Sequence, residues 1–263
     1  MKKTIFLFLL ICNFLKLYSD NSMESNYTNT FAGLSYAIDL MSEIKFEKQK
    51  MIISHSEIEN KNFVSDYTVE QNGKICFINL EKTGEKILVL KNEDLIFLYK
   101  DNNEEPWIFA TNLGRASEGI YFPSSDSFTA SSELKEGNVK YEAGNLGIFM
   151  LNKPWVEGVE GNGEYEYVEL KANISSFYII NGYISYTKPY LYEDNSRVKK
   201  IKISFLDNPK LNDIVVELED TPNPQKVSLG TSFYGKLRLE ILEVYPGIKY
   251  EDTCITNILC NVF

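Results

Sequence analysis

The chain has 263 residues, 44% of them hydrophobic and 13% aromatic, with a formal net charge of −10. This length fits one large domain or two modest ones, and the apolar content is ordinary for a protein with a buried core. The acidic balance argues against a nucleic-acid partner and against docking on anionic lipid, because both favour a basic surface.

The first predicted element is a secretory signal peptide at residues 1–19. Two N-terminal lysines precede an almost wholly apolar run at residues 5–15. This run is too short to cross a bilayer, so we expect cleavage near Ser19 and no transmembrane span. The mature protein would then be secreted, periplasmic or at the cell surface. A lipid anchor at Cys12 is the alternative.

Cysteine and histidine usage narrows the possible chemistry. Once Cys12 has left with the signal peptide, an odd number of thiols remains, at Cys76, Cys254 and Cys260. An odd number cannot form a closed disulfide framework, and we expect buried free thiols. His55 is the one histidine of the sequence, which argues against a histidine-rich metal site and ordinary histidine-based acid–base catalysis.

Residues 20–123 are predicted to form a small β-rich domain of unassigned function. Residues 31–44 fit a short helix or an exposed strand about equally well. After them come short strand-like runs separated by turns, which suggests a small antiparallel barrel or a curled sheet. Asn72-Gly73 is a hairpin signal between two of the runs. The runs are Met51–Ser54, Phe63–Glu70, Ile75–Leu80, Lys86–Leu90, Leu95–Tyr99 and Trp107–Ala110.

A Ser-rich, linker-like stretch at residues 113–135 places the domain boundary near residue 124. Strand-like runs dominate again in residues 124–263 and predict a sandwich of antiparallel strands. In the run at residues 236–244 the alternation slips once, and a bulge near Leu242 would reconcile it. The predicted strands are Tyr165–Leu170, Phe177–Asn181, Val198–Phe205, Asp213–Leu218, Gln225–Leu229, Lys236–Val244 and Cys254–Cys260.

Three ordered motifs stand out in this second part: Trp155–Glu164 (WVEGVEGNGE), Phe177–Ile203 (containing I-I-N-G-Y and N-S-R-V-K-K-I) and Tyr245–Ile258 (YPGIKYEDTCITNI). Together they resemble the NADase-type glycan-binding domain. The resemblance covers the C-terminal half and implies an all-β protein, in which a discoidin-like, galactose-binding-like jelly-roll sandwich follows the small barrel or curled sheet. It also implies a glycan or glycoconjugate as partner and no cofactor.

The candidate carbohydrate-binding residues come from the first two motifs. Tryptophan and tyrosine rings can stack on sugars, and arginine offers a planar donor fork for hydroxyls or an acidic sugar. Each has a structural alternative: a Trp at the base of such a loop is usually core, and Arg197 could instead pair with a carboxylate of its loop and fix the fold. The candidates are Trp155, Glu157, Tyr183, Tyr190, Tyr192, Asn195 and Arg197.

The third motif is interpreted as a structural turn. Pro246-Gly247 is a type II turn signal, and two polar side chains after it can brace the backbone. The turn residues are Tyr245, Pro246, Gly247, Tyr250, Asp252 and Thr253. No metal site is predicted, because Gly147–Pro154 (GIFMLNKP) has no carboxylate where many discoidin-like domains carry a cation-supporting Asp-Gly-Asn-type loop.

These observations favour an exported, non-catalytic carbohydrate-binding or adhesion protein. An alternative is a structural or partner-binding envelope protein whose sandwich is only a scaffold. A glycan-acting enzyme is a third possibility, although the sequence has no G-x-S-x-G, P-loop or Cys–His arrangement and no carboxylate pair stands out from its acidic background.

Overall fold

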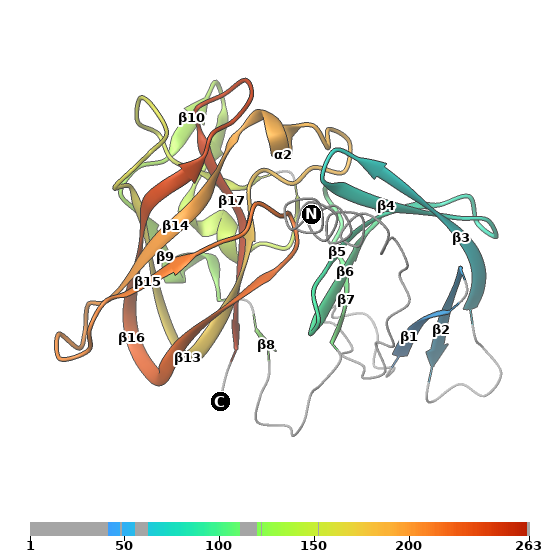
Figure 1. Cartoon of the computed structure of the whole chain (residues 1–263), viewed down its shortest axis with the longest axis horizontal. Helices are drawn as coiled ribbons and strands as arrows, with labels where there is room; N and C mark the ends of the chain where they lie inside the picture. Colours follow the sequence, from blue (N-terminus) through green and yellow to red (C-terminus); the bar gives the residue numbers. More distant parts are fainter. Residues whose placement is uncertain are drawn as a thin grey trace, which may run out of the picture.

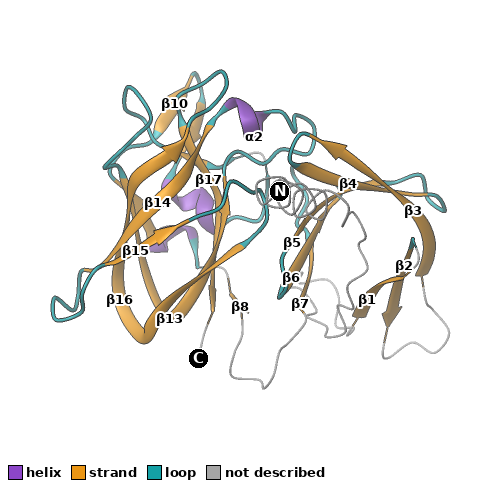
Figure 2. Cartoon of the chain, in the orientation of Figure 1, coloured by secondary structure: helices purple, strands orange, loops and turns teal. Residues whose placement is uncertain are grey.

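The computed structural model describes residues 42–47, 49–55, 63–110, 120–121, 123–151 and 153–261. The predictions for the signal peptide, for Cys12 and for most of residues 31–44 lie outside these ranges. The protein is all-β, as predicted, with one sheet beside a sandwich (Figure 1). Within the described ranges, Figure 2 shows three short helices beside the strands, η1 (Ser125–Ser127), η2 (Ala143–Gly147) and α2 (Leu191–Asp194).

The N-terminal part is an open, curled, seven-stranded sheet in which each strand pairs with the next one along the chain. The hairpin predicted at Asn72-Gly73 is confirmed, because pairing extends to Asn72 opposite Ile75. Strand β1 overlaps the end of the segment for which a helix and an exposed strand fitted about equally well, and its bounds were not predicted. The strands are β1 (Ser42–Glu47), β2 (Lys50–His55), β3 (Phe63–Asn72), β4 (Ile75–Leu80), β5 (Lys86–Lys91), β6 (Leu95–Tyr99) and β7 (Trp107–Ala110).

The sandwich is built from a strongly curved sheet with the order β12-β17-β13-β16-β14-β15. A short parallel contact between β14 and β17, at Arg197 opposite Cys254, links two strands of this order that are not neighbours. Strands β8 and β9 pair with β17 and β13, and β10 and β11 form a separate hairpin. The strands are β8 (Ile120–Tyr121), β9 (Phe128–Ala130), β10 (Leu134–Glu136), β11 (Val139–Tyr141), β12 (Trp155–Val156), β13 (Tyr167–Asn181), β14 (Ser196–Phe205), β15 (Ile214–Glu217), β16 (Gln225–Tyr245) and β17 (Thr253–Asn261).

The two longest strands differ from the prediction made for them. Each of β13 and β16 was predicted as two separate strands, but each is continuous. In β13 the polar residues near Asn173 resemble a turn in sequence, yet they face solvent and alternate with the buried Ala172 and Ile174. The bulge predicted near Leu242 is confirmed, because Glu243 and Ile241 pair with consecutive residues of β14 and Leu242 is left over.

The two parts share one apolar cluster. One face of the N-terminal sheet packs against the sandwich, and side chains from both parts form a common core. A second cluster lies within the N-terminal sheet, and a third fills the sandwich. The division at residue 124 stays a prediction. The shared cluster is formed by Ile75, Phe77, Leu88, Leu90, Leu95, Phe97 and Tyr99 of the sheet and by Leu151, Tyr178, Ile180, Ile184, Tyr192 and Leu259 of the sandwich.

Candidate functional site

The three sequence motifs converge at one end of the sandwich. Trp155 of β12 pairs with β17, which begins at Thr253. The Glu157 carboxylate accepts a hydrogen bond from the Thr253 backbone N–H at 3.2 Å. In return, the Thr253 hydroxyl donates to the backbone carbonyl of Asn162 at 2.7 Å. The glycine-rich loop of the first motif is therefore fixed to the third motif by bonds in both directions.

Ser196 connects the second motif to the other two. Its hydroxyl donates to the Asn162 side chain at 3.1 Å and accepts the Gly247 N–H at 3.0 Å. The type II turn predicted at Pro246-Gly247 is wrong, because Gly247 lacks the positive φ which that turn needs. Glycine is needed there for another reason: a side chain would collide with the carbonyl oxygens of Tyr250 and Asp194.

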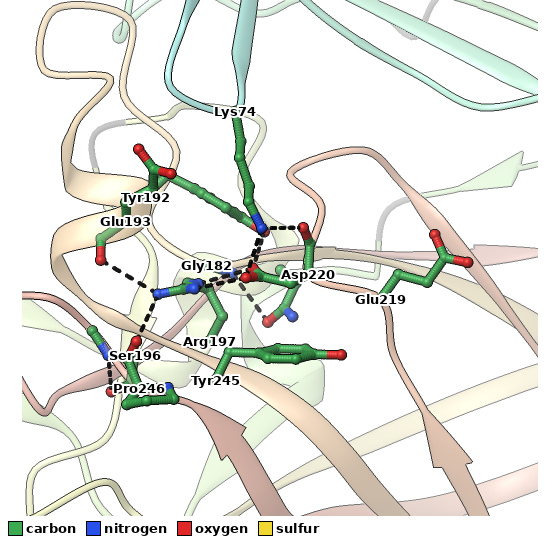
Figure 3. A network of polar contacts seen from close by, with 12 residues as sticks. Lys74, Gly182, Tyr192, Glu193, Ser196, Arg197, Glu219, Asp220, Tyr245 and Pro246 are labelled. Atoms are coloured by element: carbon green, nitrogen blue, oxygen red, sulfur yellow. Dashed lines mark hydrogen bonds and ion pairs between the residues drawn. The ribbon is translucent and has the colours of Figure 1, made fainter. Parts of the chain in front are cut away.

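Arg197 lies at the centre of this arrangement and is only 6% exposed. Its Nε and Nη2 donate to the two carboxylate oxygens of Asp220 at 3.1 and 2.9 Å. Its Nη1 donates to the backbone carbonyls of Asn195, Pro246 and Glu193 at 2.8, 3.2 and 3.4 Å (Figure 3). Arg197 thus pairs with a carboxylate, although with Asp220 and not with one from its own loop, and it ties two loops together.

The Asp220 carboxylate accepts hydrogen bonds from several side chains. The Tyr192 hydroxyl donates to it at 3.1 Å, and Lys74 of the N-terminal sheet lies 2.6 Å from its other oxygen. Burial alone would raise the pKa of Asp220, but the hydrogen bonds from Arg197 and Lys74 hold it below the usual 3.8. The ionised form of Asp220 is therefore the one that the folded protein stabilises.

We expect this lowered pKa to appear as a pH-dependent stability. A carboxyl whose pKa is depressed by folding stabilises the protein above its unfolded pKa, and the contribution is lost as the pH falls through the folded pKa. Asp220→Asn should therefore be less stable than the wild type at pH 7, and the difference should shrink below about pH 4. Urea denaturation between pH 7 and 3 measures this, and a constant difference would contradict it.

Five of the seven predicted carbohydrate-binding residues are buried, so a ligand would not reach them in this conformation. Trp155 lies in the sandwich core, and its indole N–H donates to the Ser132 carbonyl at 3.1 Å. Tyr183 is half-buried, and its ring packs edge-on against Tyr141. Tyr190 is 52% exposed. The five are Trp155, Glu157, Tyr192, Asn195 and Arg197.

Glu157 is the buried acid of this end of the sandwich. Burial raises its pKa, two backbone N–H groups lower it, and the charges of Asp252 and Glu166 raise it again, with a net upward shift. Its carboxylate accepts the Val159 N–H at 2.8 Å in addition to the Thr253 N–H. Among the residues that the structure describes, no three His, Cys, Asp or Glu side chains form a group that could hold a metal ion.

The two loops that this network holds also carry exposed side chains. Tyr190, Ile248 and Tyr250 are 52%, 80% and 39% exposed. Their two loops are joined because the Ile248 N–H donates to the Glu193 carbonyl at 3.0 Å and the Tyr250 N–H donates to the Asp194 carbonyl at 2.8 Å. We call Tyr190, Ile248, Lys249 and Tyr250 the loop-end platform.

Lys249 supplies the positive charge of the loop-end platform. Its ammonium lies 4.8 Å from the centre of the Tyr250 ring. The hydrogen bond with Tyr250 raises the pKa of Lys249, and the negative charge of Asp194 adds to this. Sequence reasoning missed Ile248 and Lys249 and treated Tyr250 as a turn residue. The available signal was the Ile-Lys-Tyr triplet, two large side chains around a cation in a turn.

The cysteines have the predicted free state, with Cys254 and Cys260 buried and Cys76 half-buried. Cys254 and Cys260 lie on the single strand β17, where the extended backbone holds them apart. In the described part of the chain, none of the helices has the length and apolar character needed to span a membrane.

Two carbohydrate-binding modules of solved structure are similar to part of this chain. The family 32 carbohydrate-binding module of C. perfringens NanJ, solved with galactose, is 14% identical over 54% of this chain and 99% of its own, with a TM-score of 0.39. CpGH89CBM32-5 from Clostridium perfringens, solved with GalNAc-β-1,3-galactose, is 17% identical over 53% and 96%, with a TM-score of 0.37.

A glycoside hydrolase structure is 9% identical over 84% of this chain and 70% of its own, with a TM-score of 0.35. No curated protein matches the sequence. Residues 121–261, which make up more than half of the chain, match the family described as the NAD glycohydrolase translocation F5/8 type C domain, and the chain belongs to this family.

Proposed function

We propose that this protein is an exported, non-catalytic carbohydrate-binding protein that contacts its glycan at the loop-end platform. The observation that carries the proposal is the presentation of Tyr190, Ile248 and Tyr250 to solvent on two loops that are bonded to each other. Binding residues commonly sit on loops held by a rigid scaffold, and these loops rest on the Arg197 and Ser196 networks. Membership of an F5/8 type C family supports the same class of function.

The chemistry of the loop-end platform suits a sugar. Tyrosine offers a large face that is apolar in the ring and polar at the hydroxyl, so it can cover a sugar ring and still bond to its substituents. Lys249 and the nearby Asp194 carboxylate supply charged groups for hydroxyls at the edge of the rings. In this proposal Arg197 acts as a positioning residue, because its donors already bond the protein's own carbonyls and Asp220.

The absence of catalysis is part of the proposal. Glu157 has the raised pKa that acid catalysts often show. However, its side chain is fully buried, and its carboxylate is bonded to the N–H groups of Val159 and Thr253. This placement favours a structural role, in which Glu157 holds the glycine-rich loop, over a catalytic role as an acid that contacts a substrate.

We expect substitutions of the tyrosines of the loop-end platform to weaken glycan binding. The mature chain should first be screened on glycan arrays in the presence and in the absence of EDTA. For the glycan found, Tyr190→Ala and Tyr250→Ala should each raise Kd about tenfold, the effect of losing a stacked ring worth about 1.4 kcal/mol. Isothermal titration calorimetry measures the change. Tyr234→Ala is the matched control, because Tyr234 is 73% exposed on β16.

Several outcomes would contradict the proposal. A mature chain that binds no glycan would favour the scaffold or partner-binding alternative. Binding that EDTA abolishes would indicate a cation site that the described residues do not form. An unchanged Kd in Tyr190→Ala and Tyr250→Ala would place the site elsewhere, and an equal loss in Tyr234→Ala would show that the effect is not specific to the loop-end platform.

A further inference from the structure

The N-terminal sheet holds the tyrosine-rich loop (residues 183–195) from one side. The Tyr186 hydroxyl donates to the Lys86 carbonyl of β5 at 2.7 Å, and its ring packs edge-on against Phe77 of β4. The Asn102 side chain accepts the Tyr186 N–H at 2.6 Å and donates to the Thr187 hydroxyl at 2.8 Å. This half of the loop is therefore anchored on residues far away in the sequence.

The tip of the β3–β4 hairpin holds the other half. In Figure 1 the hairpin reaches toward the loop that carries α2. Lys74 lies 2.6 Å from the Asp220 carboxylate and donates to the Asp220 carbonyl at 2.8 Å (Figure 3). Its neighbour Gly73 adopts a φ of +56° and lies so close to Glu193 that a side chain there would collide with the Glu193 carboxylate.

A continuous series of contacts leads from this hairpin to the loop-end platform. Asp220 receives Lys74 on one side and the Arg197 fork on the other. The same guanidinium holds the carbonyls of Glu193 and Pro246, which lie in the two loops that carry Tyr190 and Ile248. These contacts link the tip of the hairpin, through Asp220 and Arg197, to both loops of the loop-end platform.

We infer that the N-terminal sheet is a positioning element of the carbohydrate-binding site and that Lys74 is the positioning residue through which it acts. This rests on the proposed function for the identity of the site. The sheet fixes the tyrosine-rich loop from a direction that the sandwich alone does not cover.

Removing the Lys74 side chain should have a local and moderate effect on the protein. Its side chain is 37% exposed, so solvent screens part of its interaction with Asp220. Asp220 keeps Arg197 and Tyr192 when Lys74 is lost, so the protein should still fold. What changes is how often the tyrosine-rich loop opens, and amide hydrogen exchange reports such local opening.

The test is hydrogen–deuterium exchange of the full mature chain, followed by mass spectrometry. In Lys74→Met, amides at residues 188–195 and 246–250 should exchange about twofold to fivefold faster than in the wild type. Lys74→Arg should restore protection. Lys50→Met is the matched control, because Lys50 forms its ion pair with Asp66 inside the N-terminal sheet.

The readout separates this inference from the proposed function. Exchange needs no ligand, so faster exchange in both loops supports the inference even if no glycan binds. If a glycan does bind, Lys74→Met should raise Kd by a similar factor, while Lys50→Met should not. Unchanged exchange in Lys74→Met would overturn the inference. So would faster exchange throughout β13 and β16, because that would mean general destabilisation.

Discussion

Replacing Arg197 by methionine is expected to lower the free energy of unfolding by about 3 kcal/mol, the lower end of the cost of removing one partner of a buried ion pair. Methionine retains much of the packing volume but none of the donors. Three carbonyls would lose a hydrogen bond, and Asp220 would keep only Lys74 and Tyr192 near its charge. Urea denaturation at pH 7 measures the loss.

Arg238→Met is the matched control for this experiment. Arg238 also pairs with a carboxylate, Glu169, and stacks on the Tyr167 ring at 3.8 Å, but its side chain is a third exposed. Its removal should cost less than about 1 kcal/mol, as for other surface ion pairs. If Arg197→Met were as stable as the wild type and lost only glycan affinity, Arg197 would be a direct ligand and not a positioning residue.

A fragment of residues 120–263 is expected to lose its cooperative unfolding or to aggregate, although the family match spans almost all of it. Removing the N-terminal sheet would uncover large apolar side chains of the shared cluster, among them Tyr178, Ile180 and Leu259. Each such side chain contributes about 1.5 to 3 kcal/mol when buried. Their sum rivals the roughly 5 to 15 kcal/mol by which domains are stable.

Size-exclusion chromatography and thermal melting of the fragment and of residues 20–263 test this expectation. Adding a separately prepared fragment of residues 20–119 should restore the melting transition if the shared cluster is the cause. A monomeric fragment that melts at the temperature of the longer chain would show instead that the two parts are independent domains, as the predicted boundary near residue 124 implies.

Local patterns were sufficient to predict much of the fold. Strands β4, β6 and β7 have their predicted bounds, because short apolar runs between turn residues leave little freedom. The bulge at Leu242 followed from one slip in an alternating pattern. The continuity of β13 could not be read in this way, since exposed polar residues in a long strand look like a turn until their neighbours are known.

The candidate site was harder to predict, because its geometry depends on contacts between distant segments. Asp220 is one acid among many in an acidic chain, and nothing local marks it as the partner of Arg197. The tyrosines of one loop face different surroundings: Tyr186 contacts the N-terminal sheet, Tyr190 faces solvent and Tyr192 is buried. Composition identified the loop, but only the fold distinguishes its members.

Strand β17 has a consequence for how the chain reaches this fold. It is the last described strand, yet it pairs with β8, β12, β13 and β14. The sandwich therefore stays incomplete until β17 has paired with strands that lie far from it in the sequence, and pairings of high contact order form slowly. Until β17 pairs, the edges of these strands stay open, and this is the stage at which a chaperone would have most to protect.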